Sequence, residues 1–243
     1  MIAVLSPAKT LDYDTPLPGF AEPSAPRFAA EAATLAKSAA NLTQKKLADL
    51  MHISPALAKL NADRFRDFAH ADARPAAYAF AGDVYTGLDA GSLDEGQMRF
   101  AQDHLRLLSG LYGLLRPLDA IRPYRLEMGT RWAPRKTRLT DWWGDRIAAA
   151  LRDDLGDQAV LNLASQEYWA ALDGRLAGTR IVTVDFRDGD RFVSFHAKKA
   201  RGLMARWMIE HHIANLDAMR GFDADGYAFD GNASDDDRWT FRR

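Results

Sequence analysis

The 243-residue sequence contains no cysteine. The protein therefore forms no disulfide, offers no thiolate to a metal and has no cysteine nucleophile, which excludes redox sensing through its own thiols. No run approaches the roughly 18 apolar residues that a membrane-spanning helix needs. The N-terminus also lacks the basic start and the long apolar stretch of a secretory signal. We expect a soluble, cytoplasmic protein with no membrane partner.

The common cofactor and metal signatures are also missing. The sequence has neither a glycine-rich dinucleotide fingerprint nor a P-loop. Its only adjacent histidines, His211 and His212, would point to different faces of a helix, and no His-x-x-x-His or Glu-x-x-His pairing occurs. We therefore predict no metal site and no cofactor.

The composition, 47% hydrophobic and 27% charged, is that of an ordinary globular protein. Its length favours one domain over residues 1–243. Apolar spacing and turn residues predict two or three helices over 27–66, and further helices over 94–108, 141–151, 165–172 and 198–213. Predicted strands cover 2–5, 76–80, 160–163, 181–186, 192–195 and 227–229, with a hairpin turn at Asp188-Gly189. This pattern indicates an α+β fold, a single compact domain of mixed α and β structure.

The charges sum to only −1 but are unevenly distributed. Basic residues greatly outnumber acidic ones between His104 and Arg138, and a second basic cluster opens the predicted helix 198–213. Arginine's planar fork grips two phosphate oxygens at once, so the clusters favour a phosphate-bearing ligand over ordinary solvated charge. The candidate phosphate contacts are Lys9, Arg116, Arg122, Arg125, Lys198, Lys199, Arg201 and Arg206.

Two glycines lie three residues apart in the segment Leu108–Pro117. We interpret this segment as a turn between two helices, in which Ser109, Gly110 and Gly113 offer backbone N–H groups to a DNA phosphate. The alternative is purely structural: Gly110 ends one helix, and Gly113 packs closely in a turn.

Six blocks of sequence closely resemble the YaaA family of peroxide stress proteins. They are Leu5–Asp12, Gly82–Leu88, Leu108–Leu118, Pro123–Gly129, Asn162–Ser165 with Glu167-Tyr168, and Ala197–Met204. The resemblance implies a cytoplasmic protein of the hydrogen peroxide response that limits damage from intracellular iron. It also implies a single domain of unusual topology with a positively charged cleft and a helix-hairpin-helix element that binds duplex DNA.

An enzyme acting on a nucleotide or damaged nucleobase in the same cleft is the alternative to a protein that only binds double-stranded or structured DNA. Lys9 would then be a nucleophile or phosphate ligand, and Asp83 and Glu127 would be a general acid or base. Their structural interpretations are a turn cap for Asp83 and an ion pair with Arg125 or Arg131 for Glu127. Three further residues would orient the nucleotide-like ligand at a strand end, namely Asn162, Ser165 and Tyr168.

Overall fold

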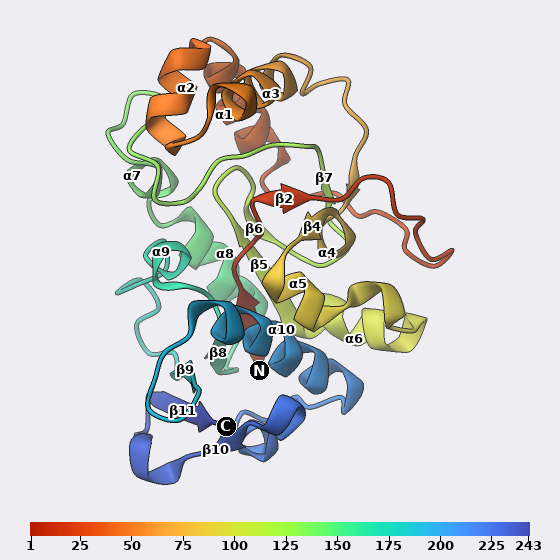
Figure 1. The fold of residues 1–243 in the computed structure, drawn as a ribbon, viewed down its shortest axis with the longest axis vertical. Helices are drawn as coiled ribbons and strands as arrows, with labels where there is room; N and C mark the ends of the chain where they lie inside the picture. Colours follow the sequence, from red (N-terminus) through yellow and green to blue (C-terminus); the bar gives the residue numbers. More distant parts are fainter.

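A seven-stranded mixed sheet organises the computed structural model, which describes all residues 1–243 (Figure 1). Its strand order is β10-β11-β9-β8-β1-β5-β6. The five central strands run parallel, and the edge strands β10 and β6 are antiparallel to their neighbours. The predicted α+β class is confirmed. The strands are β1 (Ile2–Leu5), β5 (Leu105–Ser109), β6 (Gly113–Leu115), β8 (Val160–Asn162), β9 (Ile181–Arg187), β10 (Ala228–Phe229) and β11 (Arg238–Arg242).

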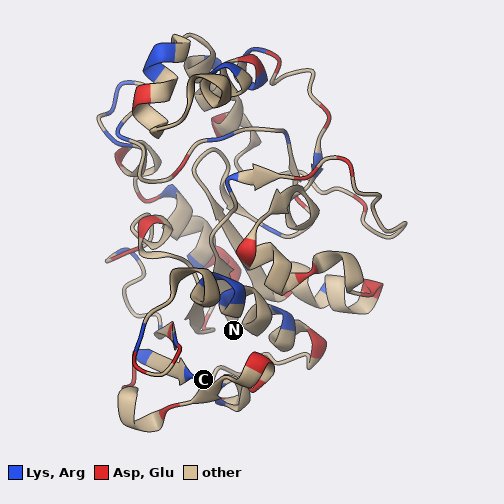
Figure 2. Cartoon of the chain, viewed as in Figure 1, with Lys and Arg blue, Asp and Glu red and all other residues tan.

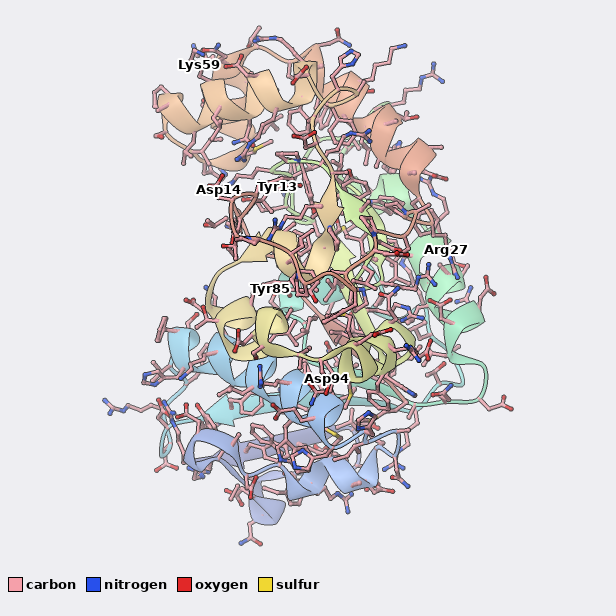
Figure 3. All side chains as sticks on the ribbon, turned by 90° about the vertical axis from the view of Figure 1, so that its right-hand side faces the viewer. Tyr13, Asp14, Arg27, Lys59, Tyr85 and Asp94 are labelled. Carbon is pink, nitrogen blue, oxygen red and sulfur yellow. The ribbon has the colours of Figure 1, made fainter.

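Three helices, α1 (Ala29–Ala40), α2 (Gln44–Met51) and α3 (Pro55–Arg66), form one end of the molecule, as the orange ribbons in Figures 1 and 3 show. Each of α2 and α3 begins where a hydroxyl side chain, Thr43 or Ser54, accepts a hydrogen bond from the first turn. The remaining helices are α4 (Ala76–Ala79), α5 (Asp83–Leu88), α6 (Glu95–His104), α7 (Leu139–Trp143), α8 (Arg146–Leu155), α9 (Gln166–Trp169) and α10 (Ser194–Glu210).

Two small two-stranded sheets connect the helical end to the main sheet. The strand β2 (Thr10–Leu11) pairs with β4 (Phe80–Ala81), and β3 (Arg74–Pro75) pairs with β7 (Ala120–Ile121). Because β2 follows directly on β1, this pairing holds the segment after β1 near the start of α5.

The core is one continuous cluster of 71 buried hydrophobic residues. All four residues of β1 are buried, as expected of a central parallel strand that is covered on both faces. On one side of the sheet, α10 contacts β1, β9 and α6, and it packs closely along α5. None of the helices is long and apolar enough to cross a membrane.

The helix predicted over residues 94–108 is confirmed as α6 up to His104, but the predicted turn between two helices in the segment Leu108–Pro117 is wrong. The helix α6 ends at His104, and residues 105–115 form the β5–β6 hairpin, in which Ser109 pairs with Gly113. All five residues of β5 are buried; residues 105–107 pair with β1, and residues 107–109 pair with β6. A fully buried strand is a continuous apolar run, which periodicity alone does not distinguish from a buried helix.

Several smaller predictions are also wrong. Residues 76–80 form α4 and the start of β4 rather than one strand, and residues 192–195 form no strand. The neighbour of β9 is instead β11, which directly follows the acidic run Asp235–Asp237 and was not predicted. A helix predicted over 141–151 is interrupted by Gly144, whose φ of 55° is left-handed, so that α7 ends and α8 begins there.

Candidate functional site

The carboxyl ends of the neighbouring parallel strands β1 and β8 open into a cavity of about 430 Å³, which we call the inner cavity. Ligands of open α/β sheets commonly bind outside this edge. The segment after β1 supplies Lys9, the segment after β8 supplies Ser165, and α5 and α10 form the opposite wall. The polar side chains that line the cavity are Ser6, Lys9, Thr10, Asp83, Ser165, Glu167, Tyr168, Lys198 and Arg201.

Arg201 is the most unusual of these residues. It is largely buried, yet it donates no hydrogen bond to the protein and has no carboxylate within ion-pairing distance. Burial lowers the pKa of its guanidinium, and the more distant Asp185 only partly opposes this effect. Unpaired buried charges are costly, so a guanidinium in this position favours an anion in the cavity.

Lys198 and Arg201 lie on the same face of α10, as their spacing predicts, and both line the inner cavity. The side chain of Lys198 is 53% exposed, and its Nζ lies 4.0 Å from a carboxylate oxygen of Asp83. An exposed pair at this distance contributes little stability, so Lys198 remains available to a ligand.

Two serines close the floor of the cavity. The Ser6 hydroxyl donates to Ser165 Oγ at 3.2 Å and accepts from the Ser165 backbone N–H at 2.8 Å. Asn162, by contrast, is buried and already hydrogen-bonded within the protein. Its side-chain amide donates to the Thr183 hydroxyl and accepts from the Ala164 N–H. Asn162 therefore shapes the loop that carries Ser165 and does not line the cavity.

Lys9 and Arg125 both pair with Glu127 Oε1, at 3.4 and 2.9 Å. The other oxygen of Glu127 is buried without a hydrogen-bond partner, beside a cavity of about 10 Å³ that Tyr168 also lines. Such a space is close to the size of one water molecule. Burial raises the pKa of Tyr168 well above its ordinary value. The expected ion pair of Glu127 with Arg125 is present, and it places Glu127 beside Lys9.

A second cavity of about 540 Å³, the outer cavity, adjoins the first, and both are lined by Lys9 and Glu167. We call the two together the α2–α10 groove. Figure 2 marks basic residues in blue on α2 and on α10, with acidic residues in red between them. The groove is lined by five cations (Lys9, Lys46, Arg131, Lys198 and Arg201) and four carboxylates (Asp49, Asp83, Glu127 and Glu167), so its charge is mixed.

The predicted phosphate contacts in the 108–117 segment do not reach this groove. Ser109 is fully buried, and its hydroxyl bonds to Tyr124 and the Tyr112 N–H. Gly110 lies against the Leu126 carbonyl, where a Cβ would come within 2.1 Å, and Gly113 has a φ of 70° that its turn requires. The structural interpretation is therefore correct for Gly113, which packs closely in a turn. It is wrong for Gly110, which lies in the turn of the β5–β6 hairpin and ends no helix.

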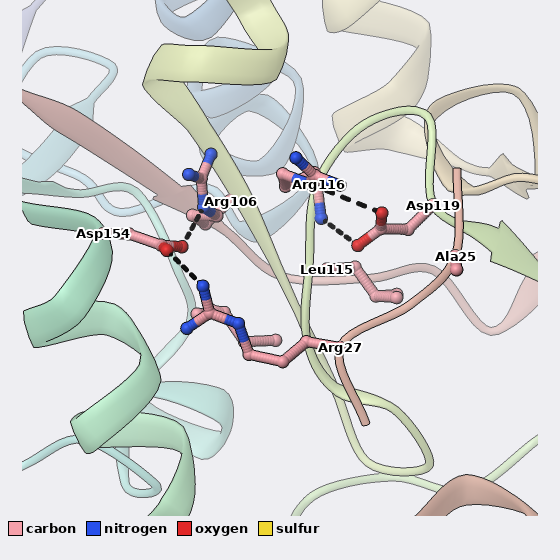
Figure 4. Close-up of a pocket in the computed structure, with 8 residues that line it drawn as sticks. Ala25, Arg27, Arg106, Leu115, Arg116, Asp119 and Asp154 are labelled. Atoms are coloured by element: carbon pink, nitrogen blue, oxygen red, sulfur yellow. Dashed lines mark hydrogen bonds and ion pairs between the residues drawn. The ribbon is translucent and has the colours of Figure 1, made fainter. Parts of the chain in front are cut away.

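Four other predicted cations lie elsewhere. Lys199 pairs with Asp225, and Arg206 pairs with Asp89 and Glu210. Arg122 lines an apolar cavity between α1 and α3. Arg116 lies beside Asp119 in a cavity of about 300 Å³, shown in Figure 4.

The same cavity holds a charge cluster that stabilises the fold. Asp154 of α8 accepts from Arg106 Nε at 2.7 Å and from Arg27 at 2.5 Å (Figure 4). Arg106 also donates to two backbone carbonyls. Arg27 and Arg106 are thus paired within the protein and are not available to a ligand.

Sequence reasoning missed Ser6, Lys46 and Glu167 as groove residues. Glu167 accepts from the Gly129 N–H at 3.3 Å, and this contact joins α9 to the segment that carries Arg131. Ser6 and Glu167 lie within or beside sequence blocks that were singled out, whereas no local signal marks Lys46. No group of three or more His, Asp or Glu side chains is arranged to hold a metal ion.

Comparison with known proteins places these residues in a family. The family model described as peroxide stress protein YaaA matches residues 1–233. A UPF0246 protein of Rhizorhabdus wittichii is 57% identical over 250 residues, covering 99% of this chain and 98% of its own. A UPF0246 protein of Ralstonia nicotianae is 50% identical over 257 residues, covering 100% and 99%. The match extends from β1 through the whole groove to β10, and the chain therefore belongs to the YaaA family of peroxide stress proteins.

Proposed function

We propose that this peroxide stress protein binds duplex or structured DNA in the α2–α10 groove, without strong sequence preference, and thereby limits iron-linked oxidative damage. The observation that carries the proposal is Arg201, a largely buried guanidinium without a protein partner that lines the groove. Lys9 and Lys198 are exposed beside it. Phosphate oxygens satisfy all three groups, and such contacts position a protein on DNA without reading its bases.

The helix pair α2–α3 supports an approach of DNA from the outer cavity. The two helices are joined by the three-residue turn His52–Ser54, and both Lys46 and His52 line this cavity. We assign the helix-hairpin-helix-like element to α2–α3 in place of residues 108–117. The DNA backbone would then run from the turn His52–Ser54 past Lys9 towards α10.

A double substitution, Lys9→Ala with Lys198→Ala, tests the DNA proposal. Each phosphate contact contributes about 0.9 to the slope of log affinity against log salt concentration, so loss of both lowers the slope by up to about 2. Arg180→Ala with Arg220→Ala is the control, because it also removes two cations, both paired with Asp217 and outside the groove. An unchanged slope in the first double variant would contradict the proposed contact surface.

An enzyme acting on a nucleotide in the same groove is the second candidate, and the carboxylates favour it. Asp83 and Glu127 repel a phosphate backbone, and the attraction of DNA to the groove does not require them. Each instead lies next to a lysine, at 4.0 and 3.4 Å, an arrangement suited to proton transfer.

Asp83→Asn separates the two candidates. If the groove only binds DNA, the substitution removes a repelling charge, so affinity rises or stays unchanged and protection from peroxide persists. If Asp83 transfers a proton, protection is lost while DNA affinity and folding remain. Asp83 suits this test better than Glu127, because it is 34% exposed and Glu127 neutralises the partly buried Arg125.

A further inference from the structure

We propose that the inner cavity binds a terminal phosphate, the phosphomonoester of a DNA end or of a free nucleotide, rather than the phosphodiester backbone of continuous duplex. The inference rests on the proposed function and names the ligand of its deepest subsite. It follows from the depth of the cations, the supply of hydrogen-bond donors and the position of the carboxylates.

The cations of the groove lie at two depths. Lys9 and Lys198, with side chains 59% and 53% exposed, stand at the mouth of the inner cavity. Arg201 is largely buried, and Ser6 on the floor is only 8% exposed. A phosphodiester within a duplex carries a sugar on both sides, so it reaches the mouth but is kept from the floor. A terminal phosphate is attached through one oxygen only and can enter.

The donors near the floor match a monoester. Such a group has three free acceptor oxygens and a charge of about −1.5 to −2 at pH 7. The guanidinium of Arg201 has no protein acceptor, and its fork suits two of these oxygens. The Ser6 hydroxyl already donates to Ser165 Oγ, so the Ser165 hydroxyl proton is free to bond the third.

The carboxylates restrict the cavity to a single phosphate. Asp83 and Glu167 line the same space as the cations, so a run of successive phosphates would meet repulsion beyond the first. The wall between Asp83 and Lys198 is also closely packed. A Cβ added to Gly87 of α5 would lie 2.2 Å from the Lys199 carbonyl oxygen. A Cβ added to Gly202 of α10 would lie 1.8 Å from the Val84 carbonyl oxygen, so only glycine fits at both positions.

Short blunt duplexes of one sequence test the inference when their ends carry a 5′-phosphate, a 3′-phosphate or only hydroxyls. We expect one phosphorylated duplex to bind at least about tenfold more tightly than the hydroxyl duplex. Arg201→Gln should abolish this difference, so that the phosphorylated and the hydroxyl duplexes bind with equal affinity. Arg180→Gln, which removes an exposed arginine outside the groove, should preserve the difference.

Two competitors distinguish the sources of the phosphate. If deoxyadenosine monophosphate binds as tightly as the phosphorylated duplex, the natural ligand is a free nucleotide, and weaker binding indicates a DNA end. Inorganic phosphate measures the contribution of the anion alone. Thermal denaturation checks the folding of Arg201→Gln, and Lys198→Gln, an exposed substitution, provides a second variant that should weaken the same preference.

The outcomes separate this inference from the proposed function. Equal affinity for all three duplexes, with no binding of the monophosphate, would overturn the terminal-phosphate subsite and leave DNA binding intact. Binding of the monophosphate without any duplex binding would support the subsite and contradict the DNA proposal. A phosphate preference that survives both Arg201→Gln and Lys198→Gln would also overturn the assignment.

Discussion

The contact between α5 and α10 yields a quantitative prediction through Gly202→Ala. An alanine Cβ at this position would lie 1.8 Å from the Val84 carbonyl oxygen and 2.7 Å from the Leu88 nitrogen, whereas real Cβ contacts stay beyond 3.0 Å. Both obstacles are backbone atoms, so no side chain can rotate away. The two helices must separate by roughly an ångström, which disrupts a close-packed interface.

Two opposing effects set the size of the stability change in Gly202→Ala. Overpacking costs about 1–3 kcal/mol, and a backbone obstacle belongs at the upper end of that range or beyond. Alanine recovers about 1 kcal/mol over glycine through its higher helix propensity. We expect a net loss of about 2 kcal/mol in the free energy of unfolding, equivalent to a fall in Tm of roughly 4–8 °C for a chain of this size.

Thermal and chemical denaturation of Gly202→Ala and Gly91→Ala measure this effect. A Cβ added at Gly91 would meet no heavy atom within 4 Å, and the φ of this residue is ordinary, so its substitution should change stability by less than about 0.5 kcal/mol. If both variants unfold like the wild type, the close approach of α5 and α10 is wrong.

Two further predictions concern charged groups outside the groove. Hydrogen bonds from Arg243 at 2.6 Å, and then from His196, lower the pKa of Asp188 to about 2. Because the folded-state pKa lies below the unfolded one, the stabilisation is present above about pH 4 and is lost as the pH falls towards 2. Asp188→Asn should therefore flatten the fall in the free energy of unfolding at acid pH, measured by denaturation. An unchanged dependence on pH would refute the assignment. Asp154→Ala leaves the buried Arg106 without its carboxylate and should lower the free energy of unfolding by about 3 kcal/mol. The salt dependence of DNA binding should change little. A stable variant with weakened DNA binding would instead place this cluster in the binding surface.

Features that depend on neighbours along the chain were predictable from the sequence. The strand Ile2–Leu5 coincides with its prediction, because an apolar run of this length, ended by Ser6-Pro7, is too short for a typical helix and suits a buried strand. Ser54-Pro55 likewise fixes the start of α3. The shared face of Lys198 and Arg201 follows from helical geometry alone.

Which residues meet depends on the tertiary structure. Residues 105–109 continue an apolar helical pattern, but they become a strand because β1 pairs with residues 105–107 and β6 with residues 107–109, which satisfies their backbone groups. The groove gathers Lys9, Glu127, Ser165 and Arg201 from four distant segments, and their partners decide which charges remain available. Local sequence marks a cation, but whether a carboxylate neutralises it depends on a fold built from long-range pairing.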